Sequence, residues 1–183
     1  KKVKEYLDII QAETRAAEKI IADLLGFARI KSADVEVVSV SELIQQTLER
    51  FPTPPSVEVT LEIPADLLQV FVDPRQVQQV LGNLVINACQ AMTPDGGELT
   101  INAKPWTVNG QSSIAIAVKD SGVGIPPENM KKLFEPLFTT KTKGIGLGLA
   151  VSQKLAEANG GRIEVQSEAG LGSTFTLVLP VQG

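Results

Sequence analysis

The chain has 183 residues, 43% of them hydrophobic and 21% charged, which is typical of one globular domain with at most a short appendage. A net charge of −4 argues against a general nucleic-acid binder, and the single cysteine, Cys89, excludes an intramolecular disulfide. No apolar stretch approaches about 18 residues, so we expect neither a membrane span nor a signal peptide. The chain contains no histidine, so histidine-dependent chemistry needs a histidine from elsewhere.

Residues 2–31 are predicted to form one long helix. Because its apolar stripe repeats every 3.5 residues on average, as in a coiled coil or helix bundle, it needs another helix to pack against. The sequence offers no second such helix, so we expect self-association, as a homodimer through residues 3–28. A helix lying alone on the globular body is the alternative. The stripe comprises Val3, Leu7, Ile10, Thr14, Ala17, Ile21, Leu24 and Ala28.

The next part of the chain is predicted to be a short link over residues 32–38, a helix over 41–51 and strands over 57–63 and 69–73. Ser39 and Glu42 fit a capping box that opens the first helix. A second helix is predicted to run to Met92, and its start is marked by Asp73 at the N-cap, Pro74 at the first helical position and Gln76 at the capping-box position.

Strands are predicted over residues 98–104 and 112–120, and the second is apolar on both faces, which indicates a central strand. A helix over 147–159 and a hairpin of strands 162–168 and 173–180 complete the chain. The expected fold class is therefore α/β, with a mixed or mostly antiparallel sheet and helices on one face.

A polar stripe runs along the predicted helix 74–92. Amide oxygens one helical turn apart, as on Asn83 and Asn87, suit a hard cation such as Mg²⁺, whose other ligands are waters and phosphate oxygens. A solvent-exposed amide face is the plainer alternative. The stripe comprises Gln76, Gln79, Asn83, Asn87 and Gln90.

The turn DSGVGI over residues 120–125 places an aspartate at the end of the predicted central strand. Gly122 and Gly124 allow a flat group to approach the backbone, and Asp120 is able to accept a hydrogen bond from an amino group such as that of adenine. An ordinary aspartate–glycine turn is the alternative interpretation.

Glycines occupy every second position of KGIGLGLAVS, at Gly144, Gly146 and Gly148, just before a predicted helix. Free amides there would suit phosphate, although the pattern matches neither a dinucleotide fingerprint nor a P-loop. A glycine hinge is the alternative. The preceding segment, 126–143, is long enough for a lid, from which Lys141 or Lys143 would reach a phosphate; a solvated basic loop is its plainer interpretation.

The order of these motifs resembles the N, G1, F, G2 and G3 boxes of sensor histidine kinases. The match extends over about residues 40–181 and consists of NLVINACQAM, DSGVGI, LFEPLFTTK, GIGLGL and GLGST. The FTTK form resembles the nitrogen-regulation subgroup. The opening helix resembles the second helix of the dimerisation and phosphoacceptor hairpin, which implies a division into residues 1–32 and a catalytic ATP-binding domain over 33–183.

The resemblance implies a Bergerat ATP-binding fold, a two-layer α/β sandwich, with ATP and Mg²⁺ as cofactors. By motif position, Asn87 would hold Mg²⁺, Asn83 would line the triphosphate pocket and Lys141 would steady the γ-phosphate. Asp120 would bind the adenine amino group. The remaining implied binding residues shape the adenine pocket, support it through water or cradle phosphates: Gly122, Gly124, Ile125, Gly144, Gly146, Leu147, Gly148, Leu149 and Thr174.

The resemblance also implies a reaction. Related ATPases carry a glutamate as the base for water where this chain has Asn83, so slow hydrolysis and transfer of the γ-phosphoryl group to another acceptor are expected. That acceptor is a histidine on the missing first hairpin helix, and a response regulator would receive the group next. We expect a cytoplasmic fragment that starts after that helix, whether or not the parent protein is membrane-anchored. Alternatives are a natural split protein, a nucleotide-binding module without phosphotransfer, an ATPase and a serine kinase.

Overall fold

The computed structural model describes residues 32–108, 110–141 and 144–181, together with seven earlier residues: Lys4, Tyr6, Leu7, Ile10, Gln11, Thr14 and Ile21. The backbone at those seven is helical, and the Thr14 hydroxyl donates to the Ile10 carbonyl at 2.8 Å. Most of the predicted helix over 2–31 lies outside the described residues, and so does most of the segment 3–28 through which we expect the homodimer to form. Within the described part of the chain, no helix has the length and apolar character needed to cross a membrane.

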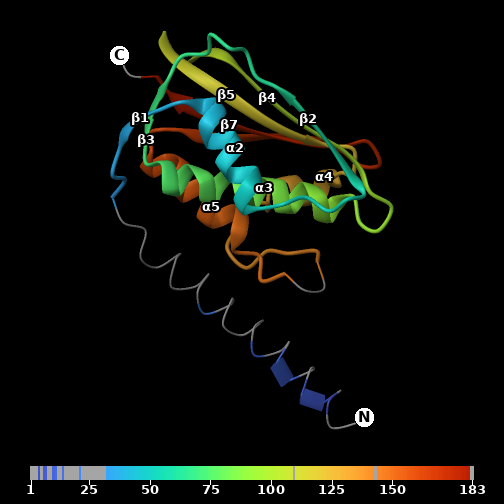
Figure 1. The fold of residues 1–183 in the computed structure, drawn as a ribbon. Helices are drawn as coiled ribbons and strands as arrows, with labels where there is room; N and C mark the ends of the chain where they lie inside the picture. Colours follow the sequence, from blue (N-terminus) through green and yellow to red (C-terminus); the bar gives the residue numbers. More distant parts are fainter. Residues whose placement is uncertain are drawn as a thin grey trace.

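A five-stranded mixed sheet forms one layer of the fold, in the order β2-β4-β5-β7-β6 (Figure 1). β2 is parallel to β4, and the other neighbouring strands are antiparallel. β5 is the middle strand and is buried on both faces over most of its length, which confirms the predicted central strand. The strands are β2 (Val57–Glu62), β4 (Gly97–Val108), β5 (Gln111–Asp120), β6 (Arg162–Glu168) and β7 (Gly172–Pro180).

Helices form the second layer and cover one face of this sheet (Figure 1). They are α2 (Val40–Arg50), α3 (Pro74–Ala91) and α5 (Gly148–Ala158), with a short α4 (Pro127–Met130) before α5. The core lies between the layers, where Ile114 and Ile116 of β5 are fully buried together with Leu84 of α3. The predicted two-layer α/β architecture is therefore confirmed.

The predicted link over residues 32–38 contains a strand that the sequence analysis missed. β1 (Glu36–Val38) pairs antiparallel with β3 (Val70–Val72), and the two form a separate two-stranded sheet. Three residues are too few to show strand periodicity, and the partner is more than 30 residues away in the sequence, so the local pattern carries no signal for this pairing.

The predicted strand over 98–104 also continues further, to Val108, although it contains Pro105. Pairing with β2 ends at Asn102, while pairing with β5 continues through Pro105. Beyond Asn102, β4 is therefore an edge strand, and an edge tolerates a proline because one side of its backbone needs no ladder partner.

The helix starts differ in how they are capped. Ser39 has the backbone conformation of an N-cap, but its hydroxyl contacts the Ser41 hydroxyl at 2.8 Å and makes no capping bond, so the predicted capping role of Ser39 is wrong. The predicted N-cap of α3 is confirmed, because the Asp73 carboxylate accepts the backbone N–H groups of Arg75 at 3.0 Å and Gln76 at 3.2 Å.

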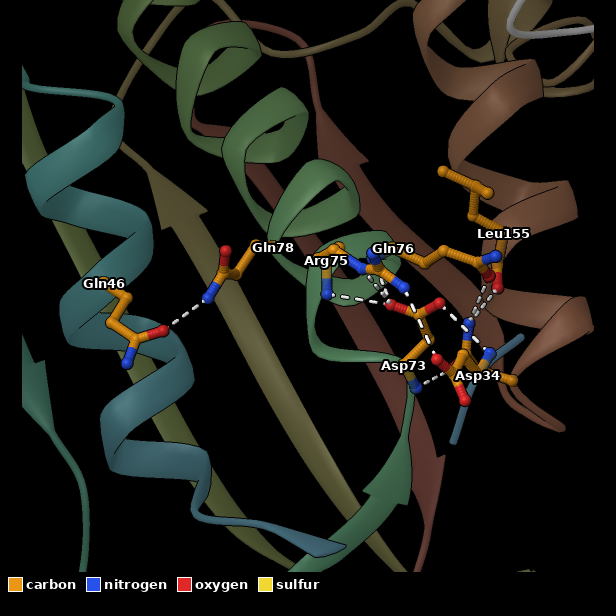
Figure 2. A network of polar contacts seen from close by, with 8 residues as sticks. Asp34, Gln46, Asp73, Arg75, Gln76, Gln78 and Leu155 are labelled. Atoms are coloured by element: carbon orange, nitrogen blue, oxygen red, sulfur yellow. Dashed lines mark hydrogen bonds and ion pairs between the residues drawn. The ribbon is translucent and has the colours of Figure 1, made fainter. Parts of the chain in front are cut away.

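Asp73 also joins three parts of the fold (Figure 2). Its second carboxylate oxygen accepts the N–H of Asp34 at 3.1 Å, and this bond holds the segment before β1 against the start of α3. The backbone N–H of Asp73 donates to Asn159 Oδ1 at 2.7 Å. In a capping box this N–H would instead donate to the side chain of Gln76. The Asn159 amide in turn donates to Gln76 Oε1 at 2.9 Å and to the Leu155 carbonyl at 2.8 Å. The beginning of α3 is thereby tied to the end of α5.

Candidate functional site

The polar stripe predicted on α3 divides among different partners. The opposite side of the helix is packed into the core through residues such as Leu81 and Leu84. Gln76 takes part in the contact with Asn159, and Gln79 is exposed. Asn83 faces α5, and Asn87 and Gln90 face Lys141 in the segment before it, so this part of the stripe is the candidate site.

Asn83 lies where α3 meets the first turn of α5. Its Nδ2 donates to the Ser152 hydroxyl at 2.9 Å. A Cβ added at Gly148 would lie 2.6 Å from Asn83 Oδ1, so glycine is required there by the close approach of the asparagine amide. Asn83 is thereby placed beside the glycine-rich segment, and its role in lining a phosphate pocket stays a prediction.

Asn87 and Gln90 converge on one cation. The Lys141 ammonium donates to Asn87 Oδ1 at 2.8 Å and to Gln90 Oε1 at 2.6 Å. Loss of hydration where the ammonium lies against α3 lowers the pKa of the largely exposed Lys141 below its ordinary value, and the nearby Asp120 carboxylate opposes that shift. The two amide oxygens therefore form a place where positive charge is held against α3.

Asp120 ends the central strand and is 2% exposed. Its Oδ1 accepts the N–H of Gly122 at 2.9 Å. Burial raises the pKa of Asp120 above the ordinary aspartate value, whereas backbone hydrogen bonds from Gly122 and Ser173 and the charge of Lys141 act in the opposite direction. A buried carboxylate held in this way is a strong hydrogen-bond acceptor for an amino group.

The glycine turn after Asp120 is held between α3 and the β6–β7 hairpin. A Cβ at Gly122 would lie 2.5 Å from the Ala91 carbonyl oxygen, and one at Gly124 would lie 2.0 Å from that of Glu168. Gly124 also has a φ of +67°, a conformation that favours glycine. The N–H of Ile125 donates to the Ser167 hydroxyl at 2.8 Å. The glycines therefore allow other parts of the protein backbone to approach this turn closely, and the approach of a flat ligand group stays a prediction.

Ser173, rather than Thr174, is the residue of β7 paired with Asp120, and the supporting role predicted for Thr174 stays a prediction. Asp120 pairs with Ser173 and Lys119 pairs with Thr174, and residues paired across an antiparallel sheet share a face. Ser173 is 5% exposed, and its hydroxyl lies 2.9 Å from that of Ser167, on the side of Asp120. The sequence contained a signal for this placement, because alternate residues of a strand point to the same side and Ser173 lies two residues before the core residue Phe175.

The segment between α4 and α5 folds back on itself, and its glycines make this possible. Gly146 has a φ of +73°, its carbonyl accepts the N–H of Leu137 at 3.0 Å, and a Cβ there would lie 2.3 Å from the Phe138 carbonyl oxygen. A Cβ at Gly144 would lie 2.9 Å from the Thr139 hydroxyl. This fold-back places Lys141 over α3; Lys143 lies outside the described residues.

The first turn of α5 comes directly after this glycine-rich segment. Leu147 is 2% exposed and occupies the N-cap without a side-chain cap, and Leu149 packs against the core. Phe134, which lies in the segment between α4 and α5, also packs against the core. N–H groups at the beginning of a helix that lack a side-chain cap suit phosphate oxygens, and phosphate binding at the segment that ends in Gly148 stays a prediction.

Comparison with known proteins agrees with this geometry. A family model described as "Histidine kinase-, DNA gyrase B-, and HSP90-like ATPase" matches residues 72–183. The chain is 38% identical over 180 residues to the signal transduction histidine-protein kinase AtoS of Escherichia coli strain K12, and 33% identical over 180 residues to sporulation kinase E of Bacillus subtilis strain 168. These alignments cover 97% of this chain but 29% and 24% of those two proteins.

Solved structures show the same similarity. Full-length ShkA in complex with AMPPNP matches 97% of this chain and 38% of its own, with a TM-score of 0.81 and 25% identity. The nucleotide-free catalytic domain of the histidine kinase ThkA matches 81% of this chain and 96% of its own, with a TM-score of 0.67 and 28% identity.

The fold and the site define an ATP-binding domain of the Bergerat type. The chain belongs to the family of histidine kinase-, DNA gyrase B- and HSP90-like ATPases, and within it to the ATP-binding catalytic domains of two-component histidine kinases.

Proposed function

We propose that this chain binds Mg-ATP at the site formed by α3, the Asp120 turn and the glycine-rich segment, and transfers the γ-phosphoryl group to a histidine outside its 183 residues. Asn83 carries this proposal. Its amide is anchored to Ser152 beside the glycine-rich segment, in the place where related ATPases have a glutamate. An amide does not accept a proton from water, so activation of water for hydrolysis lacks its base.

The residues present fit Mg²⁺. The Lys141 ammonium already shows that Asn87 Oδ1 and Gln90 Oε1 point at one cation, 2.8 and 2.6 Å away. Mg²⁺ takes oxygen ligands and keeps several waters, and when bound here it would neutralise charge on the transferring phosphoryl group. We assign Asn87 as its protein ligand, since Asn87 lies nearer Asn83 on the same flank of α3.

Adenine recognition is assigned to Asp120. Its buried carboxylate accepts the exocyclic amino group, and Gly122 and Gly124 let the flat base approach the backbone, with Ile125 beside it. Ser173 is a further candidate here, because it shares the face of Asp120. The phosphates are assigned to the backbone around Gly144, Gly146 and Gly148, which leads into α5.

In the transfer step, a histidine ring nitrogen forms a bond to the γ-phosphorus while the bond from that phosphorus to the bridging oxygen breaks, and ADP leaves. Lys141 steadies the γ-phosphate. An aspartate of a response regulator then receives the group from the phosphohistidine. We further propose that residues 1–32 belong to the dimerisation and phosphoacceptor hairpin, that residues 33–183 are the catalytic domain, and that a homodimer forms through residues 3–28 in the cytoplasm.

The test is phosphoryl transfer to a supplied acceptor. The chain is mixed with a helical hairpin that carries the histidine of the family and with ATP labelled at the γ-phosphate. We expect acid-labile label on the hairpin, and none on a matched hairpin whose histidine is replaced by glutamine. Absence of label despite demonstrated docking and nucleotide binding would favour a nucleotide-binding module without phosphotransfer. Rapid multiple-turnover ATP hydrolysis would favour an ATPase.

A further inference from the structure

Lys141 occupies the place that the proposed function gives to a divalent cation. Its ammonium donates to Asn87 Oδ1 and Gln90 Oε1, both on α3. The backbone N–H of Lys141 also donates to the Thr139 hydroxyl at 3.1 Å, which fixes the turn that presents the lysine. Asn87 is half-buried, whereas Gln90 and Lys141 are exposed, so the contact is open to exchange with a ligand from solvent.

An ammonium and a divalent cation on the same amide oxygen would lie close enough to repel each other strongly. An ammonium 2.8 Å from Asn87 Oδ1 fills the position from which a divalent cation would approach, and repulsion between the charges adds to the steric conflict. Gln90 strengthens the hold of the ammonium, because it accepts the shorter of the two hydrogen bonds. Nearby Asp120 favours positive charge in this region, whichever cation supplies it.

We propose that Lys141 is a built-in competitor for the divalent cation, that Gln90 is the positioning residue that holds it on Asn87, and that the displaced lysine discriminates triphosphate from diphosphate. This inference rests on the proposed Mg-nucleotide site. A bound Mg-triphosphate displaces the ammonium but offers its γ-phosphate as a new partner. A bound Mg-diphosphate displaces it without that compensation, so Lys141 returning to Asn87 and Gln90 favours release of the diphosphate product.

The experiment is a set of calorimetric titrations with Mg-AMPPNP and Mg-ADP, on the wild-type chain, Lys141→Met and Gln90→Met. Lys141→Met removes the competitor and also the partner of the γ-phosphate, so we expect Mg-ADP to bind about threefold to tenfold more tightly while Mg-AMPPNP gains nothing. Gln90→Met weakens the competitor and keeps the lysine, so both nucleotides bind more tightly, by about twofold to threefold.

Lys104→Met is the matched control. It makes the same change of charge on the open face of β4, where the Lys104 ammonium lies 5.2 Å from the centre of the Trp106 ring. We expect it to leave both affinities unchanged. A second control repeats the titrations with ADP in EDTA, where the gain in affinity must disappear because no divalent cation then competes for Asn87.

Two results would overturn the inference: Mg-ADP affinity that is unchanged or lower in both variants, or a gain that persists in EDTA. Failure of the proposed function would give a different result, because a folded wild-type chain would then bind neither Mg-nucleotide. The ratio of the Mg-ADP affinity to the Mg-AMPPNP affinity separates this role of Lys141 from a general effect on folding, because a folding defect would weaken the binding of both nucleotides.

Discussion

The backbone N–H of Asp73 donates to the side-chain oxygen of Asn159 at 2.7 Å, and each residue is 4% exposed. This buried bond joins the first residues of α3 to the last residues of α5. The same two helices carry the candidate nucleotide ligands, Asn83 and Asn87 on α3 and the glycine-rich start of α5. The spacing of the proposed phosphate site therefore depends on a junction at the far ends of the helices that form it.

Loss of the Asp73 carboxylate, which caps α3 beside this junction, is expected to destabilise the fold. Asp73→Ala removes the cap of α3 and leaves the N–H groups of Asp34 and Gln76 without their acceptor, so we predict a loss of about 2 kcal/mol in the free energy of unfolding. Gln78→Ala is the control, because it removes only an exposed contact with Gln46 (Figure 2) and changes stability by less than about 0.5 kcal/mol. Urea denaturation measures both, and equal values would contradict the assigned role of Asp73.

Nucleotide affinity is expected to depend on the ionisation of Asp120. Because burial raises the pKa of Asp120, its carboxyl takes up a proton at a higher pH than an ordinary aspartate does. The protonated acid is a poorer acceptor for the adenine amino group, so affinity should fall as pH decreases through that raised pKa. Calorimetry over an acidic pH series measures this, with Asp120→Asn as the comparison. An Asp120→Asn chain with the wild-type affinity and pH profile would exclude Asp120 as the acceptor.

The same pKa shift predicts a cost in stability. A carboxyl whose pKa is raised in the folded state stabilises the fold most below its unfolded pKa, and that contribution is lost as pH rises through the folded value. The charged form of Asp120 therefore opposes folding at neutral pH in the absence of nucleotide, as expected of a residue retained for binding.

Ser173 and Thr174 are neighbours on β7 with opposite orientations. Because Ser173 shares the face of Asp120 and Thr174 does not, Ser173→Ala should weaken AMPPNP binding by about threefold to tenfold, whereas Thr174→Ala should leave it within about twofold. Parallel titrations of the two variants test this. A loss confined to Thr174→Ala would show that the threonine reaches the nucleotide after all.

The Asp120 turn is expected to reject a side chain at Gly124. Gly124→Ala places a Cβ 2.0 Å from the Glu168 carbonyl oxygen at a φ of +67°. Gly170→Ala is a matched control, with a φ of +84° and no atom within 4 Å of the added Cβ. Conformational strain alone is worth about 1 kcal/mol, so Gly124→Ala should lower the free energy of unfolding clearly more than Gly170→Ala does. Comparable losses would mean that the hairpin moves aside.

Local patterns in the sequence were sufficient for much of this fold. The cap at Asp73 was predictable because its partners, Arg75 and Gln76, are two and three residues away. The central strand was predictable because its apolar residues occupy both faces. The amide oxygens on α3 and the carboxylate at the Asp120 turn followed from helical spacing and from the position of a turn.

Contacts between distant segments were not predictable in the same way. β1 pairs with β3 across more than 30 residues, and Asn159 reaches Asp73 across 86. The meeting of Lys141 with Gln90 depends on how the segment before α5 folds back, which involves a positive φ at Gly146 and packing against α3. The placement of Ser173 was available from strand alternation, but motif position pointed to Thr174.

Binding of a non-hydrolysable ATP analogue is the most direct test of the account. The chain is titrated calorimetrically with AMPPNP and Mg²⁺, beside Asp120→Ala and Asn87→Ala. We predict saturable binding by the wild-type chain, a loss of at least about tenfold in affinity for Asp120→Ala, and binding by Asn87→Ala that no longer depends on Mg²⁺. A folded wild-type chain that does not bind the analogue, or an Asp120→Ala chain that binds it with unchanged affinity, would contradict the nucleotide site proposed for this domain.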